Sequence, residues 1–138
     1  QNIDGLHQAA GSKNVLELHG TTHRFYCTRC GKEMPEDEAY KCAGVPRCSC
    51  GGIVRPDVVL YGESLNERVI TEAVMAISQC DLLIVGGTSL NVYPAAGLVR
   101  YYRGKKLVLI NKSTTDMDSA ADLVLHDAIG DVFSHIEL

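Results

Sequence analysis

This sequence lacks three features: a long apolar run, a secretory leader and a cluster of positive charge. Each absence makes one class of partner or location unexpected. No apolar run approaches the roughly 20 residues that a membrane-spanning helix needs, so we expect no membrane partner. No basic stretch followed by an apolar one forms a secretory leader, so we expect a cytoplasmic protein. The 13 Lys and Arg residues are scattered among 17 Asp and Glu residues, with a net charge of −4. A nucleic-acid partner is therefore not expected either.

The sequence also lacks an initiator Met, and its first residues, QNIDGLHQAAG, are typical of the middle of a protein. We therefore expect a fragment whose N-terminal part is missing. A chain of 138 residues can bury one core, and a small second module could lie beside it.

Cysteine is concentrated in one part of the chain, since five of the six cysteines lie between residues 27 and 50. Four of them form two close pairs, Cys27 with Cys30 and Cys48 with Cys50. Close pairs in a chain without a leader are more often a metal site than a disulfide framework. Four thiolates from two turns match the tetrahedral ligand set of Zn²⁺, and a site filled by four protein ligands is structural rather than catalytic.

The sequence supports the other cysteines and the nearby histidines less well as metal ligands. Cys42 has no close partner and is a possible substitute ligand, whereas Cys80 precedes an apolar run and is expected in the core. If four cysteines saturate the metal, His19 and His23 are not needed as ligands. Residues 21–56 contain little that could form an independent core, so we expect the metal to hold this segment together.

The apolar pattern elsewhere predicts alternating strands and helices. The segment NVLELHG predicts a short strand over residues 14–20 that ends at His19. Ser64 and Glu67 form a predicted capping box before an amphipathic helix. Continuous apolar runs predict buried strands at residues 81–87, 105–111 and 121–127. A helix is expected after Pro94, and a closing helix is expected from Ile129. The order predicts an α/β fold with a parallel sheet and helices on both faces.

Ligands of such sheets bind at the carboxyl ends of the strands, where we expect three polar groups: His19, GGTS at 86–89, and Asn111. An imidazole with an ordinary pKa near 6.5 can accept a proton at neutral pH, although a packed or solvated histidine is the alternative. The Gly-rich turn could bind phosphate or ribose oxygens, or it could be a plain capped turn.

Two further segments leave similar alternatives open. Asn2 and Asp4 could bind a carboxamide, but a capping turn would explain them as well. Residues 55–63 could be an exposed edge that pairs with a peptide, or a strand that simply re-enters the main domain.

Taken together, these motifs resemble the sirtuins, the NAD-dependent protein-lysine deacylases, and above all their bacterial branch. The resemblance runs nearly end to end through Gln1–Asp4, Leu18–Gly20, the two cysteine pairs, Arg55–Val59, Tyr61–Glu63, Gly87–Leu90, Val92, Pro94 and Ile110–Asn111. It implies a Rossmann-like NAD-binding domain over residues 1–20 and 57–138, incomplete at its N-terminus. A zinc-binding module over residues 21–56 would be inserted in it.

The resemblance also implies roles for the matched residues. His19 would be the general base that deprotonates a ribose hydroxyl of NAD, and the Zn²⁺ would be structural. The residues expected to contact NAD are Gln1, Asn2, Asp4, Gly87, Thr88, Ser89, Asn111 and Ile129. The residues expected to pair with an acylated-lysine protein or peptide are Val58, Val59, Tyr61, Gly62 and Glu63. The implied reaction transfers the acyl group from lysine to ADP-ribose and releases nicotinamide. If the pKa of His19 is little shifted, the rate of this reaction would fall as the pH drops to near or somewhat above 6.5, because the imidazole becomes protonated.

Two features depart from the family pattern. The Gly-rich phosphate loop and the Phe-Arg cofactor loop would lie upstream of Gln1, and the second cysteine pair encloses one residue rather than the commoner two. Three alternatives remain open: a zinc-ribbon binding module, a non-catalytic NAD or ADP-ribose binder, and a sirtuin-like mono-ADP-ribosyltransferase.

Overall fold

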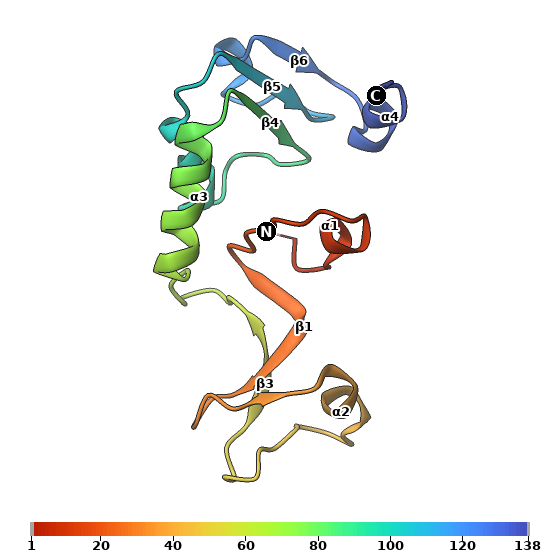
Figure 1. Ribbon diagram of the computed structural model, residues 1–138, viewed down its shortest axis with the longest axis vertical. Helices are drawn as coiled ribbons and strands as arrows, with labels where there is room; N and C mark the ends of the chain where they lie inside the picture. Colours follow the sequence, from red (N-terminus) through yellow and green to blue (C-terminus); the bar gives the residue numbers. More distant parts are fainter. Residues whose placement is uncertain (1, 138) are drawn as a thin grey trace. The chain divides into compact units, whose positions relative to one another are not determined.

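The computed structural model describes residues 2–137, and the chain divides into two compact units, one up to Ile70 and one from Thr71 onwards. Each unit contains its own sheet (Figure 1). Gln1, one of the expected NAD contacts, lies outside the described residues. Within residues 2–137, no helix is both long enough and apolar enough to cross a membrane.

The first unit is built around an antiparallel sheet with the strand order β2-β1-β3. Its elements are α1 (Leu6–Ala9), β1 (Gly20–Cys27), β2 (Glu33–Met34), α2 (Glu36–Lys41) and β3 (Val54–Val58). Strand β1 pairs with both other strands, and β3 lies at an edge of this sheet.

The strand predicted over residues 14–20 is wrong. Residues 14–17 have no regular structure, and β1 begins at Gly20, which pairs with Val58 of β3. An alternating pattern suits a strand, but a strand also needs a neighbour to accept its hydrogen bonds. His19 therefore lies directly before a strand and not at the end of one.

Residues 21–56 contain a small hydrophobic core of their own, contrary to the expectation that little in this segment could form one. That a metal holds the segment together stays a prediction. The buried members are Phe25, Cys27, Ala39 and Val54, with Met34 and Cys48 packed against them. The ring of Phe25 also meets the ring of Tyr40 edge-on, with 5.2 Å between their centroids. Burial of these side chains stabilises the module in addition to any metal.

The second unit has a parallel sheet with the strand order β4-β5-β6 (Figure 1). The elements of this part of the chain are α3 (Glu67–Gln79), β4 (Leu82–Gly86), η1 (Ala95–Tyr101), β5 (Lys106–Ile110), η2 (Asp118–Ala120), β6 (Leu123–Leu125) and α4 (Ile129–Ser134). Parallel strands alternating with helices confirm the predicted α/β class, and all three strands predicted here are present.

Two details of the helices differ from the prediction. The cap of α3 is Asn66, whose Oδ1 accepts the backbone N–H groups of Arg68 at 3.0 Å and Val69 at 3.3 Å. The predicted capping box at Ser64 is therefore wrong, because the helix begins at Glu67 and Asn66 accepts N–H groups of its first turn. The helix after Pro94 is present, but it is a 3₁₀ helix.

Burial in the second sheet is uneven. Leu109 and Ile110 of β5 are 1% and 2% exposed, whereas Leu82 and Ile84 of β4 are 51% and 41% exposed. The expected burial on both faces therefore holds for β5 in this chain and does not hold for β4.

Candidate metal centre and catalytic residues

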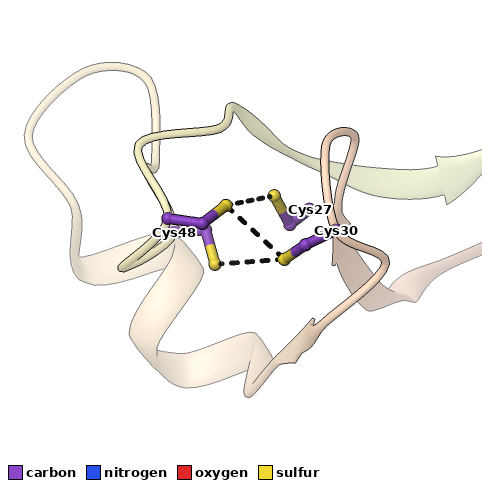
Figure 2. A group of neighbouring side chains, drawn as sticks. Cys27, Cys30 and Cys48 are labelled. Carbon is purple, nitrogen blue, oxygen red and sulfur yellow. Dashed lines mark hydrogen bonds between the residues drawn. The ribbon is translucent and has the colours of Figure 1, made fainter.

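Two tight turns bring the four paired cysteines together. Cys27 ends β1 and Cys30 lies in the turn after it, while Cys48 and Cys50 lie in the turn before β3. All four sulfur atoms lie within 4.8 Å of one another. Figure 2 shows the side chains of Cys27, Cys30 and Cys48 pointing toward one another from these turns.

Backbone hydrogen bonds and glycines shape both turns. The N–H of Gly31 donates to the carbonyl of Cys27 at 2.9 Å, and the N–H of Gly51 donates to the carbonyl of Cys48 at 2.8 Å. Gly31 and Gly51 adopt positive φ angles of 71° and 82°, which glycine tolerates without strain. A Cβ on Gly52 would lie 2.6 Å from the Cys27 sulfur, so the absence of a side chain there leaves room for the cluster.

The distances between the sulfur atoms fit a tetrahedral metal ion. Cys27 and Cys50 approach to 3.5 Å, Cys30 and Cys50 to 3.5 Å, and Cys30 and Cys48 to 3.7 Å. Zn–S bonds of about 2.3 Å in a tetrahedron place neighbouring sulfurs about 3.8 Å apart. A disulfide would require about 2.05 Å, so the cluster is one of free thiols. The residues present therefore fit Zn²⁺.

Ionisation within the cluster is unequal. The backbone N–H of Cys50 lowers the pKa of Cys48 to about 6. The backbone N–H of Gly52 lowers the pKa of Cys50, but the thiols of Cys30 and Cys27 together with burial outweigh it and raise this pKa to about 12. Crowded thiolates repel one another, and a divalent cation among them removes that repulsion.

The other cysteines and the nearby histidines lie outside this cluster. The thiol of Cys42 is exposed and faces the carbonyl of Glu38 at 3.4 Å, and the thiol of Cys80 faces the carbonyl of Ile77 at 3.3 Å. Among the residues that the structure describes, neither His19 nor His23 belongs to the group of possible metal ligands.

His19 has a buried ring nitrogen that is not satisfied. Its Nδ1 has no hydrogen-bond partner within residues 2–137, while its backbone carbonyl accepts the N–H of Val59 at 3.0 Å. Burial of the ring lowers the pKa of His19 below its ordinary 6.5. A buried, unpaired polar atom costs free energy, so this nitrogen is suited to a hydrogen bond from a bound group.

The glycine after this histidine is required by a close approach of two backbones. Gly20 has a φ of 76°, and a Cβ there would lie 1.8 Å from the carbonyl oxygen of Asp57. Only glycine fits where β1 begins against β3. The structure thus requires a glycine at position 20, whereas the ring nitrogen Nδ1 of His19 remains without a partner among the described residues.

Asn2 and Asp4 form a local turn at the start of α1. The Asp4 carboxylate accepts the backbone N–H of Leu6 at 3.1 Å, and the side-chain amide of Asn2 donates to it at 3.3 Å. The carbonyl of Ile3 accepts hydrogen bonds from the N–H and the hydroxyl of Thr22 at 3.0 and 3.1 Å. A local turn around Asp4 therefore precedes α1, whose N-cap residue is Gly5, and the Ile3 carbonyl joins this segment to β1.

The residues expected to pair with a peptide form the end of β3 and the turn after it. Val58 pairs with Gly20, and the turn closes through the N–H of Glu63, which donates to the carbonyl of Leu60 at 3.0 Å. Arg55 donates to the Glu63 carboxylate at 3.1 Å and to the carbonyl of Val58 at 2.6 Å. Through these bonds Glu63 fixes the shape of the turn.

The tip of this turn is accessible: Tyr61 is fully exposed, and Gly62 has a φ of 85°.

Within the second unit, three of the expected NAD contacts meet at the carboxyl ends of the strands. The N–H of Gly87 donates to the carbonyl of Ile110, and the N–H of Asn111 donates to the carbonyl of Leu125, both at 3.0 Å. Ile129 packs on Gly86, where a Cβ would lie 2.3 Å from its Cδ1. Gly87 and Asn111 therefore lie at the carboxyl ends of the strands, as the position of the motifs predicted, and Ile129 packs beside the end of β4.

Thr88 and Ser89 belong to the turn that follows β4. The hydroxyl of Thr88 accepts the backbone N–H of Leu90 at 3.2 Å, and Leu90 has a positive φ of 55°. Ser89 is exposed. The turn therefore combines a local hydrogen bond at Thr88 with an accessible hydroxyl at Ser89.

One polar residue of the first unit was not recognised from the sequence. His23 contacts Glu36 and the carbonyl of Asp4, which lie 13 and 19 residues away. No local motif could have revealed it, because both partners come from other segments.

The family of the chain follows from its likeness to known proteins. The family model described as the Sir2 family matches residues 1–94. The chain belongs to the Sir2 family. This Sir2 chain is 58% identical over 137 residues to an NAD-dependent protein deacetylase of Cutibacterium acnes, and 61% identical over 138 residues to one of Clostridium perfringens. A solved Sir2 structure with a p53 peptide and NAD⁺ is 41% identical, with a TM-score of 0.85.

This Sir2 chain spans a little over half the length of the relatives it matches. The alignments cover 99% of the chain but 56% and 57% of the two bacterial deacetylases, and 96% of the chain but 57% of the solved structure. The predicted division into a Rossmann-like domain and a module at 21–56 stays a prediction, as do the roles expected for the site residues.

Proposed function

We propose that this chain carries the catalytic histidine and part of the cofactor site of an NAD-dependent protein-lysine deacylase. The observation that carries the proposal is its 58% identity, over 99% of its length, to a protein named NAD-dependent protein deacetylase. The proposed arrangement is a Rossmann-like domain over residues 1–20 and 57–138 with a zinc-binding module at 21–56. The bacterial relatives and the free thiols support the predicted cytoplasmic location.

NAD, when bound, supplies the ADP-ribose that accepts the acyl group from lysine, and nicotinamide leaves. His19 is proposed to take the proton of a ribose hydroxyl. Its unsatisfied, buried Nδ1 supports this role, and its lowered pKa keeps the ring neutral and able to accept a proton at pH 7. Asn2 and Asp4 are proposed to bind the nicotinamide carboxamide. Gly87, Thr88, Ser89, Asn111 and Ile129 are proposed to hold the rest of the cofactor.

An acylated-lysine peptide is proposed to add as a strand along Val58 and Val59 and to contact the turn of Tyr61, Gly62 and Glu63. The edge position of β3 in its sheet supports this, because an edge strand offers free backbone groups to an extended peptide. The Arg55–Glu63 pair holds the turn in place.

The cysteine cluster is proposed to hold one structural Zn²⁺ through Cys27, Cys30, Cys48 and Cys50. Sulfur separations of 3.5 to 3.7 Å support this proposal. Four protein ligands leave no open position, so the metal would stabilise the module and take no part in the reaction.

The test of the function is His19→Ala in the whole protein, with an acetylated peptide and NAD. Removing a positioned base should slow deacylation by about 10²–10⁴-fold and leave zinc content unchanged. In the wild type, burial lowers the pKa of His19, so activity should persist as the pH falls past 6.5 and decline only below it. This limit lies lower than the one predicted for a His19 whose pKa is little shifted. Release of nicotinamide and of free lysine measures the rate.

The matched control is His7→Ala, an exposed histidine on α1 that should leave the rate unchanged. A His19→Ala protein that deacylates at the wild-type rate would remove His19 from the mechanism. Transfer of ADP-ribose to the peptide, without loss of the acyl group, would favour the mono-ADP-ribosyltransferase alternative. NAD binding without nicotinamide release would favour a non-catalytic binder.

A further inference from the structure

The ring of His23 bridges two segments that are far apart in the sequence. His23 lies on β1, and its Nδ1 is 3.0 Å from the carboxylate of Glu36 in α2. Its Nε2 is 3.1 Å from the backbone carbonyl oxygen of Asp4. The segment that carries Asn2 and Asp4 is thereby joined to α2 through one side chain.

Both partners of this ring are hydrogen-bond acceptors. An ionised carboxylate and a backbone carbonyl have no proton to donate. A neutral imidazole carries one N–H group and can satisfy only one of them, whereas an imidazolium carries two and satisfies both. The bridge is therefore complete only when His23 is protonated.

We propose that His23 is a proton-dependent positioning residue that ties the segment of Asn2 and Asp4 to helix α2. The bridge itself stands on the geometry of the first unit alone. Its consequence for catalysis rests on the proposed function, in which Asn2 and Asp4 bind nicotinamide. When His23 loses a proton, the remaining N–H stays on Nδ1, because the ionised Glu36 carboxylate is a stronger acceptor than a backbone carbonyl. The Asp4 carbonyl is then released and the hold on the cofactor weakens, while His19 continues to act as the base.

Packing around the ring supports this role. A Cβ on Gly5 would lie 2.8 Å from Cδ2 of His23, so the chain after Asp4 passes directly against the imidazole. Beside it, the backbone N–H of Thr22 donates to the carbonyl of Ile3 at 3.0 Å. The Thr22 amide is therefore a direct reporter of whether this segment is attached to β1.

The hydrogen-bond acceptors and the charges around the ring favour the protonated form of His23. The Asp4 carbonyl and then the Glu36 carboxylate raise the pKa of His23 above 6.5. The charged groups that face the ring or lie beside it are Glu36 of α2, Asp4 and Glu17 before β1, and Arg24 on β1, which pairs with Asp57 of β3. Because the pKa is raised in the folded protein, the bridge is fully present below pH 6.5 and is lost as the pH rises through the raised pKa.

The test is an NMR titration of the 138-residue chain prepared with Zn²⁺, in which ring shifts report the protonation of His23. The pKa of His23 should lie above 6.5, and Glu36→Gln should lower it. The matched control is Asp37→Asn, which removes the same charge from the next position of α2, where Asp37 pairs with Lys41. This control should shift the pKa much less. Equal shifts in both variants, or a wild-type pKa at or below 6.5, would overturn the bridge.

Amide hydrogen exchange then reports whether the segment of Asn2 and Asp4 detaches from β1 when His23 loses its proton. Exchange at Thr22, corrected for its intrinsic pH dependence, should accelerate several-fold as His23 loses its proton. In His23→Gln this step should disappear, because the glutamine amide does not titrate. A wild-type Thr22 amide that does not respond to the titration would also contradict the proposal.

Kinetics of the whole protein separate this inference from the proposed function. The KM for NAD should rise through the His23 titration with little change in kcat, and His23→Gln should abolish that rise. A constant KM in an active deacylase would refute the positioning role. An inactive protein whose His23 titrates as expected would refute the proposed function and leave the bridge standing.

Discussion

Single residues in the first unit are held by partners from other segments. His19 anchors the chain through its backbone carbonyl to Val59, while its Nδ1 is left without a partner among residues 2–137. His23 differs in having both ring nitrogens occupied. Two histidines that are four residues apart thus have opposite shifts in pKa, because burial dominates at His19 and acceptor groups dominate at His23.

The cysteine cluster gives a prediction at this same scale. Cys48→Ser should release the metal and destabilise residues 21–56, because a serine hydroxyl replaces one of four thiolates that surround the ion. Elemental analysis of the purified chain should find one zinc in the wild type and a loss in the variant.

Cys42→Ser is the matched control for this experiment. Its thiol faces the carbonyl of Glu38 and lies outside the cluster, so the variant should keep its zinc. Loss of zinc from Cys42→Ser, or its retention in Cys48→Ser, would show that the choice of ligands is wrong.

Helices and strands match the prediction where the sequence has continuous apolar runs, and they differ from it where contacts with other segments decide. The apolar runs of β4, β5 and β6 were predicted correctly, because a strand in a parallel sheet is apolar along its length. The alternating residues 14–17 were predicted as a strand, but they find no neighbouring strand in the described structure. The cap of α3 depends on which side chain reaches its first N–H groups, and Asn66 does so.

The burial of β5 leads to a prediction about the stability of the second unit. Leu109 is 1% exposed, so Leu109→Ala should lower the free energy of unfolding by about 2–5 kcal/mol through lost contacts and a cavity. Urea denaturation of this chain, followed by circular dichroism, measures the change.

Leu82→Ala is the same substitution on the neighbouring strand, at a side chain that is 51% exposed. It should cost clearly less than Leu109→Ala, because less apolar surface is lost from the interior. Similar losses for the two variants would mean that β5 is not the centre of this unit.

At the scale of the whole molecule, the chain presents two sheets of different kinds in two compact units. The antiparallel sheet carries the cysteine cluster at the ends of β1 and β3, and His19 lies directly before β1. The parallel sheet brings Gly87, Asn111 and Ile129 to the carboxyl ends of its strands, where ligands of such sheets bind. Residues proposed to contact NAD thus occur in each unit.

The parallel sheet leads to a prediction about cofactor affinity in the whole protein. Ser89→Ala or Asn111→Ala should each weaken NAD binding by about fivefold, since each removes a hydrogen bond that contributes about 1 kcal/mol. Calorimetric titration with NAD measures the change.

Ser78→Ala is a suitable control, since its hydroxyl donates to the carbonyl of Met75 on α3 and has no proposed contact with the cofactor. This variant should bind NAD as the wild type does. Unchanged affinity in both Ser89→Ala and Asn111→Ala would exclude these two residues from the cofactor site.

The sequence by itself determined the features that depend on neighbouring residues. The spacing of Cys27, Cys30, Cys48 and Cys50 predicted the four-thiol cluster, because a close pair in a tight turn brings two sulfurs together. The apolar runs predicted the parallel sheet and the edge at which Asn111 lies. The ordered motifs from Gln1–Asp4 to Ile110–Asn111 resembled those of the sirtuins, and the Sir2 family model confirms that resemblance.

Only the tertiary structure decided what depends on distant partners. Gly20 is required because the carbonyl of Asp57 occupies the space of a side chain, 37 residues further along the sequence. His23 acquires a role only when Asp4 and Glu36 meet its ring from two sides. The physical reason is that hydrogen bonds and van der Waals contacts act over a few ångströms in space, whatever the separation of the groups along the chain.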